Sequence, residues 1–156
     1  MHVIERVKDF LGIEGLRLTL RVHGEPQLID GVLAGEVALD SLREQRVERL
    51  SLLLTERYSR GRGDARLIDT YELGGLVRDT DIAVGAGEQV VVPFELHFTP
   101  RPSPAERFLA GRPLAGPLTR LARLTVGASS EYELRASARV RGISLTPTAS
   151  LPLDFS

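Results

Sequence analysis

Hydrophobic and polar residues alternate along most of this chain, which is the pattern of β-strands with one buried face. Leu16, Leu18 and Leu20 fall on one face, while Arg17 and Thr19 fall on the other. The same period of two recurs between turn signals rich in glycine, proline and aspartate. We expect strands over residues 16–23, 32–39, 46–58, 66–73, 80–84, 90–98, 131–140 and 143–153. Regular strand and turn spacing without long helical patterns predicts an all-β sandwich.

One of these strands carries a further signal. The turn at Gly87 leads into a strand whose apolar side chains share one face, and Pro93 lies within it. Because proline has no N–H to donate to a ladder, this strand is expected near a sheet edge. We predict that Phe94 and Leu96 are buried and that Val91 and Glu95 lie on the opposite face.

Two segments depart from the strand pattern. Apolar residues recur at spacings of three and four near the start of the chain, so a short N-terminal helix is expected before Gly12 (Val3, Ile4, Val7, Phe10 and Leu11). We expect it to cap the sandwich, with a partner-binding or membrane-surface role as the alternative. The long connection from Pro100 to Gly127 is expected to be helical around 105–124, packed on a sheet edge or a sandwich end, with a basic membrane-surface segment as the alternative.

Composition narrows the class of protein. A length of 156 residues fits a single domain, and the absence of cysteine excludes disulfides and thiolate chemistry. A net charge of -1 gives no field that attracts nucleic acid. No apolar run reaches the roughly 18 residues of a membrane span, and the N-terminal segment lacks the apolar centre of a secretory signal. We therefore expect a cytoplasmic protein without nucleic-acid binding or integral membrane association.

No catalytic or cofactor pattern is found. The three histidines lack ligand spacing, no serine lies in a nucleophile elbow, and the glycine pairs at 74–75 and 85–87 are interpreted as turns rather than phosphate loops. We expect no catalytic residue, no cofactor and no metal site. Asp79 and Asp81 could supply two oxygen ligands to calcium, but the further ligands are missing, so a solvated turn is the favoured interpretation.

The end of the long hairpin is the candidate partner-binding site. Arg57, Arg60, Arg62 and Arg66 surround a glycine-rich tip that contains one acid, Asp64. Guanidinium groups bind carboxylates and phosphates in a bidentate manner, so this tip could contact an acidic partner. A purely solubilising role is the favoured interpretation of this tip, and partner binding is the alternative.

Several of these features together resemble a known family. They are the N-terminal segment leading into 11–15, the strand 16–22, the long strand ending at 53–58, and the Gly87 turn into 92–96 followed by Thr99 and Pro100. This order of elements resembles the bacterial sporulation-control protein family, whose members adopt an arrestin-like fold of immunoglobulin-like β-sandwich lobes. The resemblance covers residues 1 to 100 best. It implies a single-lobe member over residues 1–156, with no catalytic residue to carry over.

The resemblance implies a non-enzymatic regulatory or scaffold protein that acts through protein contacts, by strand addition at a sheet edge or through loops. The protein partner is not identified by the sequence. There are two alternatives. The first is a structural homo-oligomer assembled through sheet edges, and the second is an enzyme or a metal-dependent ligand-binding sandwich.

Overall fold

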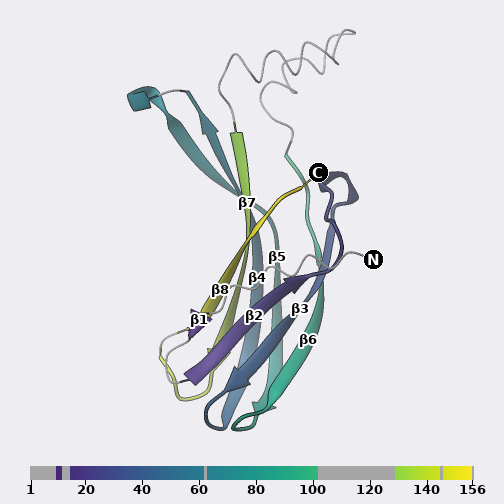
Figure 1. Ribbon diagram of the computed structural model, residues 1–156, viewed down its shortest axis with the longest axis vertical. Helices are drawn as coiled ribbons and strands as arrows, with labels where there is room; N and C mark the ends of the chain where they lie inside the picture. Colours follow the sequence, from purple (N-terminus) through teal and green to yellow (C-terminus); the bar gives the residue numbers. More distant parts are fainter. Residues whose placement is uncertain (1–9, 12–14, 62, 102–128, 145, 156) are drawn as a thin grey trace.

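Two antiparallel four-stranded sheets form the protein, as a computed structural model shows for residues 10–11, 15–61, 63–101, 129–144 and 146–155 (Figure 1). The first sheet has the order β1-β2-β3-β6, and the second has the order β5-β4-β7-β8. The strands of the first sheet are β1 (Phe10–Leu11), β2 (Leu16–Val22), β3 (Val32–Ser41) and β6 (Gln89–His97). The strands of the second sheet are β4 (Gln45–Arg60), β5 (Leu67–Val84), β7 (Ser129–Val140) and β8 (Thr148–Leu153). Two 3-10 turns, Leu28–Asp30 and Gly63–Ala65, lie in loops.

The core lies between the sheets and is built mainly from leucine and valine. Leu18 and Leu39, in β2 and β3, are fully buried, as are Leu54 and Leu134 in β4 and β7. Each comes from the apolar face of an alternating strand, so the pattern of the sequence selects the face that is buried. Burying a leucine side chain stabilises a fold by about 1.5–3 kcal/mol, so the two facing layers hold the sheets together.

The structure confirms the all-β sandwich and the edge position of β6. Pro93 pairs with Glu36 of β3 while its other side faces away from the ladder, because β6 is the last strand of its sheet. Phe94 and Leu96 are buried, whereas Val91 and Glu95 are exposed, as predicted.

The predicted break between residues 73 and 80 is wrong, because β5 is one continuous strand from Leu67 to Val84. Gly74 and Gly75 are not a turn. A Cβ on Gly74 would lie 2.5 Å from the backbone oxygen of His97, so this glycine allows β5 to approach the end of β6 closely. The ladder between β4 and β5 shifts register at Leu54/Thr55, where β5 accommodates one extra residue.

The structure also corrects the predicted N-terminal helix and the predicted start of the last strand. Phe10 and Leu11 form β1 and pair with Leu18 and Arg17, so this part of the expected helix is a strand; pairing with the open edge of β2 outweighs the local helical spacing. The rest of that helix and the helical connection at 105–124 lie outside the described residues. The last strand begins at Thr148 rather than Ile143, because a turn follows Val140 and Pro147 has no N–H for the ladder.

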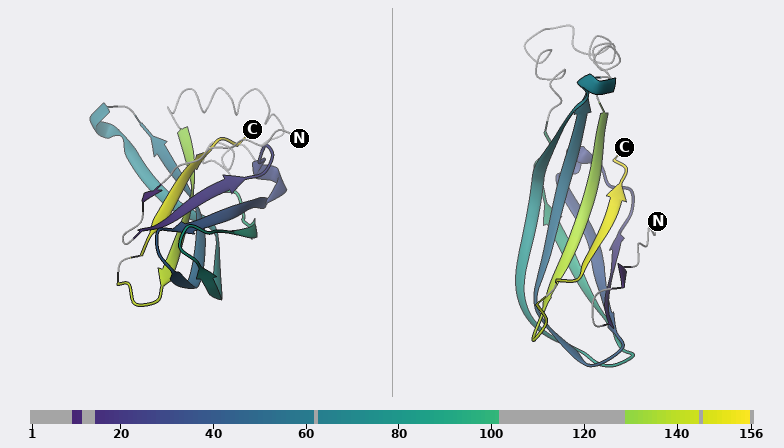
Figure 2. Two further views of the ribbon diagram at one scale, coloured as in Figure 1. Left: turned by 60° about the horizontal axis from the view of Figure 1, so that its bottom comes forward. Right: turned by 90° about the vertical axis from the view of Figure 1, so that its left-hand side faces the viewer.

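The two long sides of the sandwich differ. On one side β5 approaches β6: the Thr99 N–H donates to the Leu73 oxygen at 3.1 Å, and Arg78 Nη1 donates to the Pro93 oxygen at 3.4 Å. On the other side β2 and β8 are the nearest strands, and they belong to different sheets (Figure 2). The second sheet also extends past the first at the end where the β4–β5 hairpin turns (Figure 1).

Candidate functional site

The part of the second sheet that extends past β6 is the most distinctive surface of the molecule. It consists of residues 55–60 of β4, 67–72 of β5 and 129–133 of β7, and we call it the distal extension. Within the part of the chain that the structure describes, the last backbone hydrogen bond between β5 and the segment after β6 is made by the Leu73 oxygen, so residues 67–72 lie past this contact. On the other flank β8 reaches only Tyr132, so β7 also continues past its neighbour.

A buried carboxylate lies at the root of the distal extension. Glu56 pairs in register with Tyr71 of β5 and with Tyr132 of β7, and it is only 5% exposed. Ser130 Oγ donates a hydrogen bond of 2.7 Å to Glu56 Oε2. A polar group this buried needs a hydrogen-bond partner, so Ser130 contributes to the stability of this end of the sheet.

All three tyrosines of the chain lie on the same face of the distal extension. Tyr71 and Tyr132 flank Glu56, and Tyr58 follows two residues later along β4, where it is 6% exposed. The three tyrosines come from three different strands, and only the register of these strands brings them together.

Aromatic contacts connect this face to the end of the sandwich. The ring of Tyr132 meets that of Phe155 edge-on at 4.8 Å, and Phe155 lies 5.7 Å from Phe98 between ring centroids. The guanidinium carbon of Arg101 lies 3.1 Å from the centre of the Tyr71 ring, in a cation–π contact. These contacts fix the inner face of the distal extension against two segments distant in sequence.

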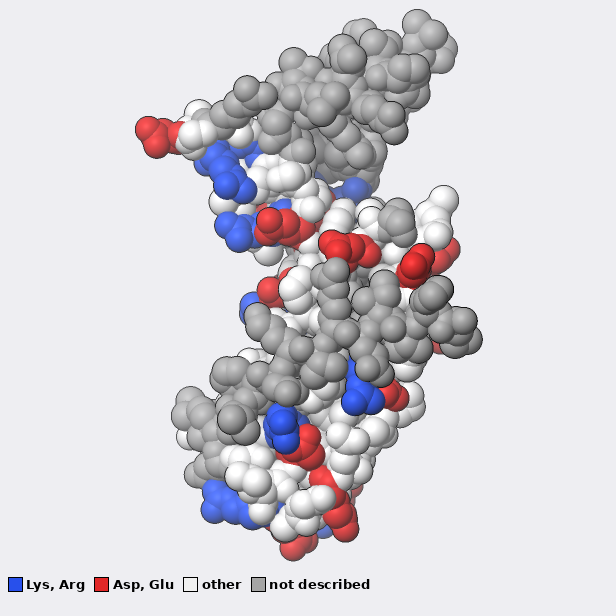
Figure 3. Space-filling view, viewed as in Figure 1, with Lys and Arg blue, Asp and Glu red and all other residues white. Residues whose placement is uncertain are grey.

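The candidate arginines lie on this extension, but not as one cluster. Arg57, Arg60 and Arg66 are exposed, and Arg62 lies outside the described residues. Strand alternation places Arg57 on one face and Arg60 on the face that carries Tyr58, while Arg66 donates to Ser59 on the face of Arg57. Figure 3 shows basic side chains over the hairpin, with an acidic group at its tip.

Each of the two arginines on the first face has a polar neighbour. Arg57 Nη1 lies 4.0 Å from Glu131 Oε2, with both side chains more than half exposed, so the pair is weak. Arg66 Nη2 donates to Ser59 Oγ at 3.3 Å. The guanidinium groups therefore stay accessible to a partner with carboxylate or phosphate groups.

Metal binding finds no support in the described ranges. Within them no three histidine, aspartate or glutamate side chains lie close enough to hold an ion. The two carboxylates considered for calcium face arginines: Arg49 Nε donates to Asp79 Oδ1 at 2.8 Å, and Arg46 Nη1 donates to Asp81 Oδ1. The hydrogen bond and the charge of Arg46 hold the pKa of Asp81 below its ordinary value.

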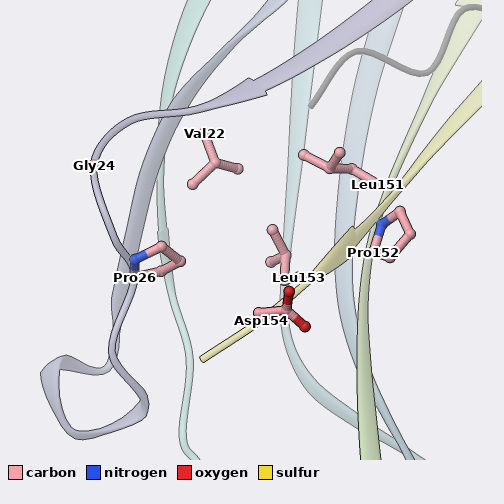
Figure 4. A pocket seen from close by; sticks show the side chains of 7 residues that line it. All are labelled: Val22, Gly24, Pro26, Leu151, Pro152, Leu153 and Asp154. Carbon is pink, nitrogen blue, oxygen red and sulfur yellow. The ribbon is translucent and has the colours of Figure 1, made fainter. Parts of the chain in front are cut away.

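Two hollows in the described surface are poor candidates for a small-molecule site. A cavity of about 50 Å³ lies on the open side of the sandwich, where Val22 and Pro26 face Leu151 and Leu153 (Figure 4). This volume is well below the several hundred Å³ of typical ligand pockets. A hollow of about 270 Å³ at the opposite end from the distal extension is lined by Arg46 and Arg141, and both guanidinium groups already donate to carboxylates.

Across the described ranges of the chain, no helix has the length and apolar character that a membrane crossing requires.

The two antiparallel sheets and their order define an arrestin-like β-sandwich. Among solved structures, the chain is similar to Spo0M, a sporulation control protein from Bacillus subtilis, with a TM-score of 0.57 and 12% sequence identity. The match covers 90% of this chain and 49% of the Spo0M chain, so this chain spans about half the length of that protein. At this identity the likeness shows a relationship of fold. No family model and no curated protein matches the sequence.

Sequence reasoning found the hairpin and its arginines, but it missed the tyrosine face and the buried Glu56. The spacing of Glu56 and Tyr58 in the sequence already places them on the same face of a strand. A glutamate at an inward position, however, suggests from the sequence alone that the apolar face has ended. Its burial depends on β7, which follows only after a long connection.

Proposed function

We propose that this protein is a non-enzymatic regulatory or scaffold module that acts through protein contacts, and that the distal extension is its contact surface for an acidic partner. The observation that carries the proposal is the exposure of Arg57, Arg60 and Arg66 on a part of the sheet that projects past β6. A projecting surface can reach a partner without a change in the sandwich.

The distal extension is suited to present these arginines in fixed positions. The Ser130–Glu56 hydrogen bond and the contact between Tyr132 and Phe155 anchor its inner face. Preorganised side chains lose less conformational entropy on binding, so fewer contacts are needed for a given affinity. Arginine forks on both faces of one hairpin favour a partner that wraps around its end.

The fold supports a regulatory role by analogy. The similar solved structure is titled a sporulation control protein, and we extend a comparable role in stress or developmental regulation to this chain as part of the proposal. The cytoplasmic location expected from the sequence is part of the same proposal. A metal-dependent binder is not favoured, because the described ranges hold no group of three acidic or histidine side chains that could bind an ion.

The proposal is tested by comparing what three forms of the protein retain from native cell extract. The forms are the wild type, an Arg57→Ser/Arg60→Ser variant, and an Arg43→Ser/Arg139→Ser control that removes the same charge away from the distal extension. We expect a partner to be depleted on the first variant alone and its binding to the purified wild type to weaken as salt rises. An identical set of retained proteins on all three forms would exclude the distal extension as the contact surface.

A further inference from the structure

The outer edge of β5 differs from the other long terminal strands in its sequence. In the second sheet β5 is one of the two terminal strands, and residues 67–72 lie past the hydrogen bond that joins Leu73 to Thr99, after β6. Among the described residues no backbone hydrogen bond is made on that side of residues 67–72, although Arg101 contacts the Tyr71 ring. In the views of Figures 1 and 2, this stretch of β5 faces outward, away from β4.

Two of the other terminal strands contain a proline that prevents a further strand from pairing with their outer edge. β6 contains Pro93 and β8 contains Pro152. The Ala138 N–H donates to the Pro147 oxygen, so every second residue from Pro147 onward bonds to β7. Pro152 lies between two of these residues, at a position whose N–H would point away from β7. Proline in such a position prevents a further strand from adding to the edge.

The edge of β5 has no proline, and it exposes apolar side chains. Leu67 is 55% exposed and Ile68 is 43% exposed, on opposite faces of the strand. An exposed edge of this kind is a template for pairing with another strand.

The order of charges along this edge is self-complementary. Arg66 immediately precedes β5 and Glu72 lies within it, and both are exposed. The Arg66 side chain donates to Ser59, which lies on the face that Glu72 shares through its pairing with Thr55. A two-fold axis at Asp69 would pair two β5 edges antiparallel and place Arg66 of each copy opposite Glu72 of the other. Opposite charges that face each other across antiparallel strands favour this alignment.

We propose that the occupant of this edge is a second copy of the same chain, so that β5 pairs with β5 and the four-stranded sheet continues across the two-fold axis. The contact is isologous and closes after two copies, because each edge has one partner. The same register brings the two Asp69 carboxylates together on the other face, and their repulsion keeps the association reversible. This pairing is tested separately from the acidic partner proposed above, because that partner contacts Arg57 and Arg60 as well as Arg66.

Sedimentation velocity of the full 156-residue chain over a wide range of concentrations tests the pairing. We expect a reversible shift from the monomer mass of 17.1 kDa to twice that mass. Arg66→Glu alone and Glu72→Arg alone should each weaken the dimer at least tenfold, because each places two like-charged pairs across the axis. An equimolar mixture of the two variants should regain the dimer, as should the Arg66→Glu/Glu72→Arg double variant.

Two controls make the test specific. Arg57→Glu changes the same charge as Arg66→Glu but lies on β4, so it should leave the dissociation constant unchanged. Asp69→Asn should tighten the dimer, whereas Asp64→Asn in the turn should not. A chain that stays monomeric at several hundred micromolar would overturn the proposal. Equal weakening by Arg57→Glu and Arg66→Glu, or a mixture that fails to regain the dimer, would overturn it as well.

Discussion

Ser130 of β7 donates a 2.7 Å hydrogen bond to the buried carboxylate of Glu56 in β4, across 74 residues of sequence. This bond joins the strand that follows the long connection to the centre of the second sheet. It also satisfies an acid at a position where the strand pattern would otherwise place an apolar side chain. The distal extension therefore depends on a polar contact as well as on its tyrosines.

Replacing Ser130 by alanine should destabilise the protein by about 1–3 kcal/mol, because a buried carboxylate oxygen loses its donor. Urea unfolding followed by circular dichroism measures the change. Ser129→Ala removes a neighbouring exposed hydroxyl and should change the free energy of unfolding by less than about 0.5 kcal/mol. Equal effects of the two substitutions would show that the bond to Glu56 adds nothing.

Replacing Gly74 by alanine should also destabilise the protein, because the new Cβ would lie 2.5 Å from the His97 oxygen and 2.8 Å from Phe98 Cβ. Forcing atoms into a packed site of this kind costs about 1–3 kcal/mol. The matched control is Gly75→Ala, whose Cβ would lie 3.5 Å from its nearest neighbour, the Leu52 oxygen. We expect thermal melting to show a lower Tm for the first variant and little change for the second.

Phe94→Ala should cost about 3–5 kcal/mol, through lost burial and the cavity that remains. Its side chain is 6% exposed and belongs to the core cluster. Val91→Ala, on the exposed face of the same strand, is the control for a change in strand propensity alone. A loss below about 1 kcal/mol for Phe94→Ala in urea melts would contradict the position of β6 over the core.

Stability should depend on pH through the Arg46–Asp81 pair. Arg46 lowers the pKa of Asp81 in the folded protein below its ordinary value of 3.8, so the folded state favours the ionised form. This contribution is present above the unfolded-state pKa and is lost as the pH falls through the lowered pKa of the folded state. The Tm difference between wild type and Asp81→Asn should therefore shrink as the medium becomes strongly acidic.

High salt should reduce the same difference at neutral pH, because both side chains are exposed. A difference in Tm that stays constant from neutral to strongly acidic pH would argue against a role for the ion pair.

Strands that bury one complete face could be predicted from the sequence. Leu16, Leu18 and Leu20 of β2 alternate with polar residues, and the burial of these leucines follows directly. In contrast, β5 could not be recognised as one strand. Its glycines at 74 and 75 look like a turn until the backbone of His97 is seen to lie against Gly74.

The candidate site was predictable only in part. The hairpin and the separation of Arg57 from Arg60 on opposite faces follow from the period of two. The projection of this hairpin past β6 does not, because it depends on where another sheet ends. The meeting of Tyr71 and Tyr132 beside Glu56 depends on the register of strands that are distant in sequence.

The place of β4 between β5 and β7 has a consequence for how the chain folds. β4 and β5 are joined by a short hairpin turn, so their ladder can form from local contacts alone. The ladder between β4 and β7 joins Ser59 to Ser129 at its nearest, which requires closure of a far longer loop. Pairings of this kind raise the contact order and slow folding. We expect the hairpin to form early and β7 to dock late, so that Glu56 stays hydrated until the second sheet is complete.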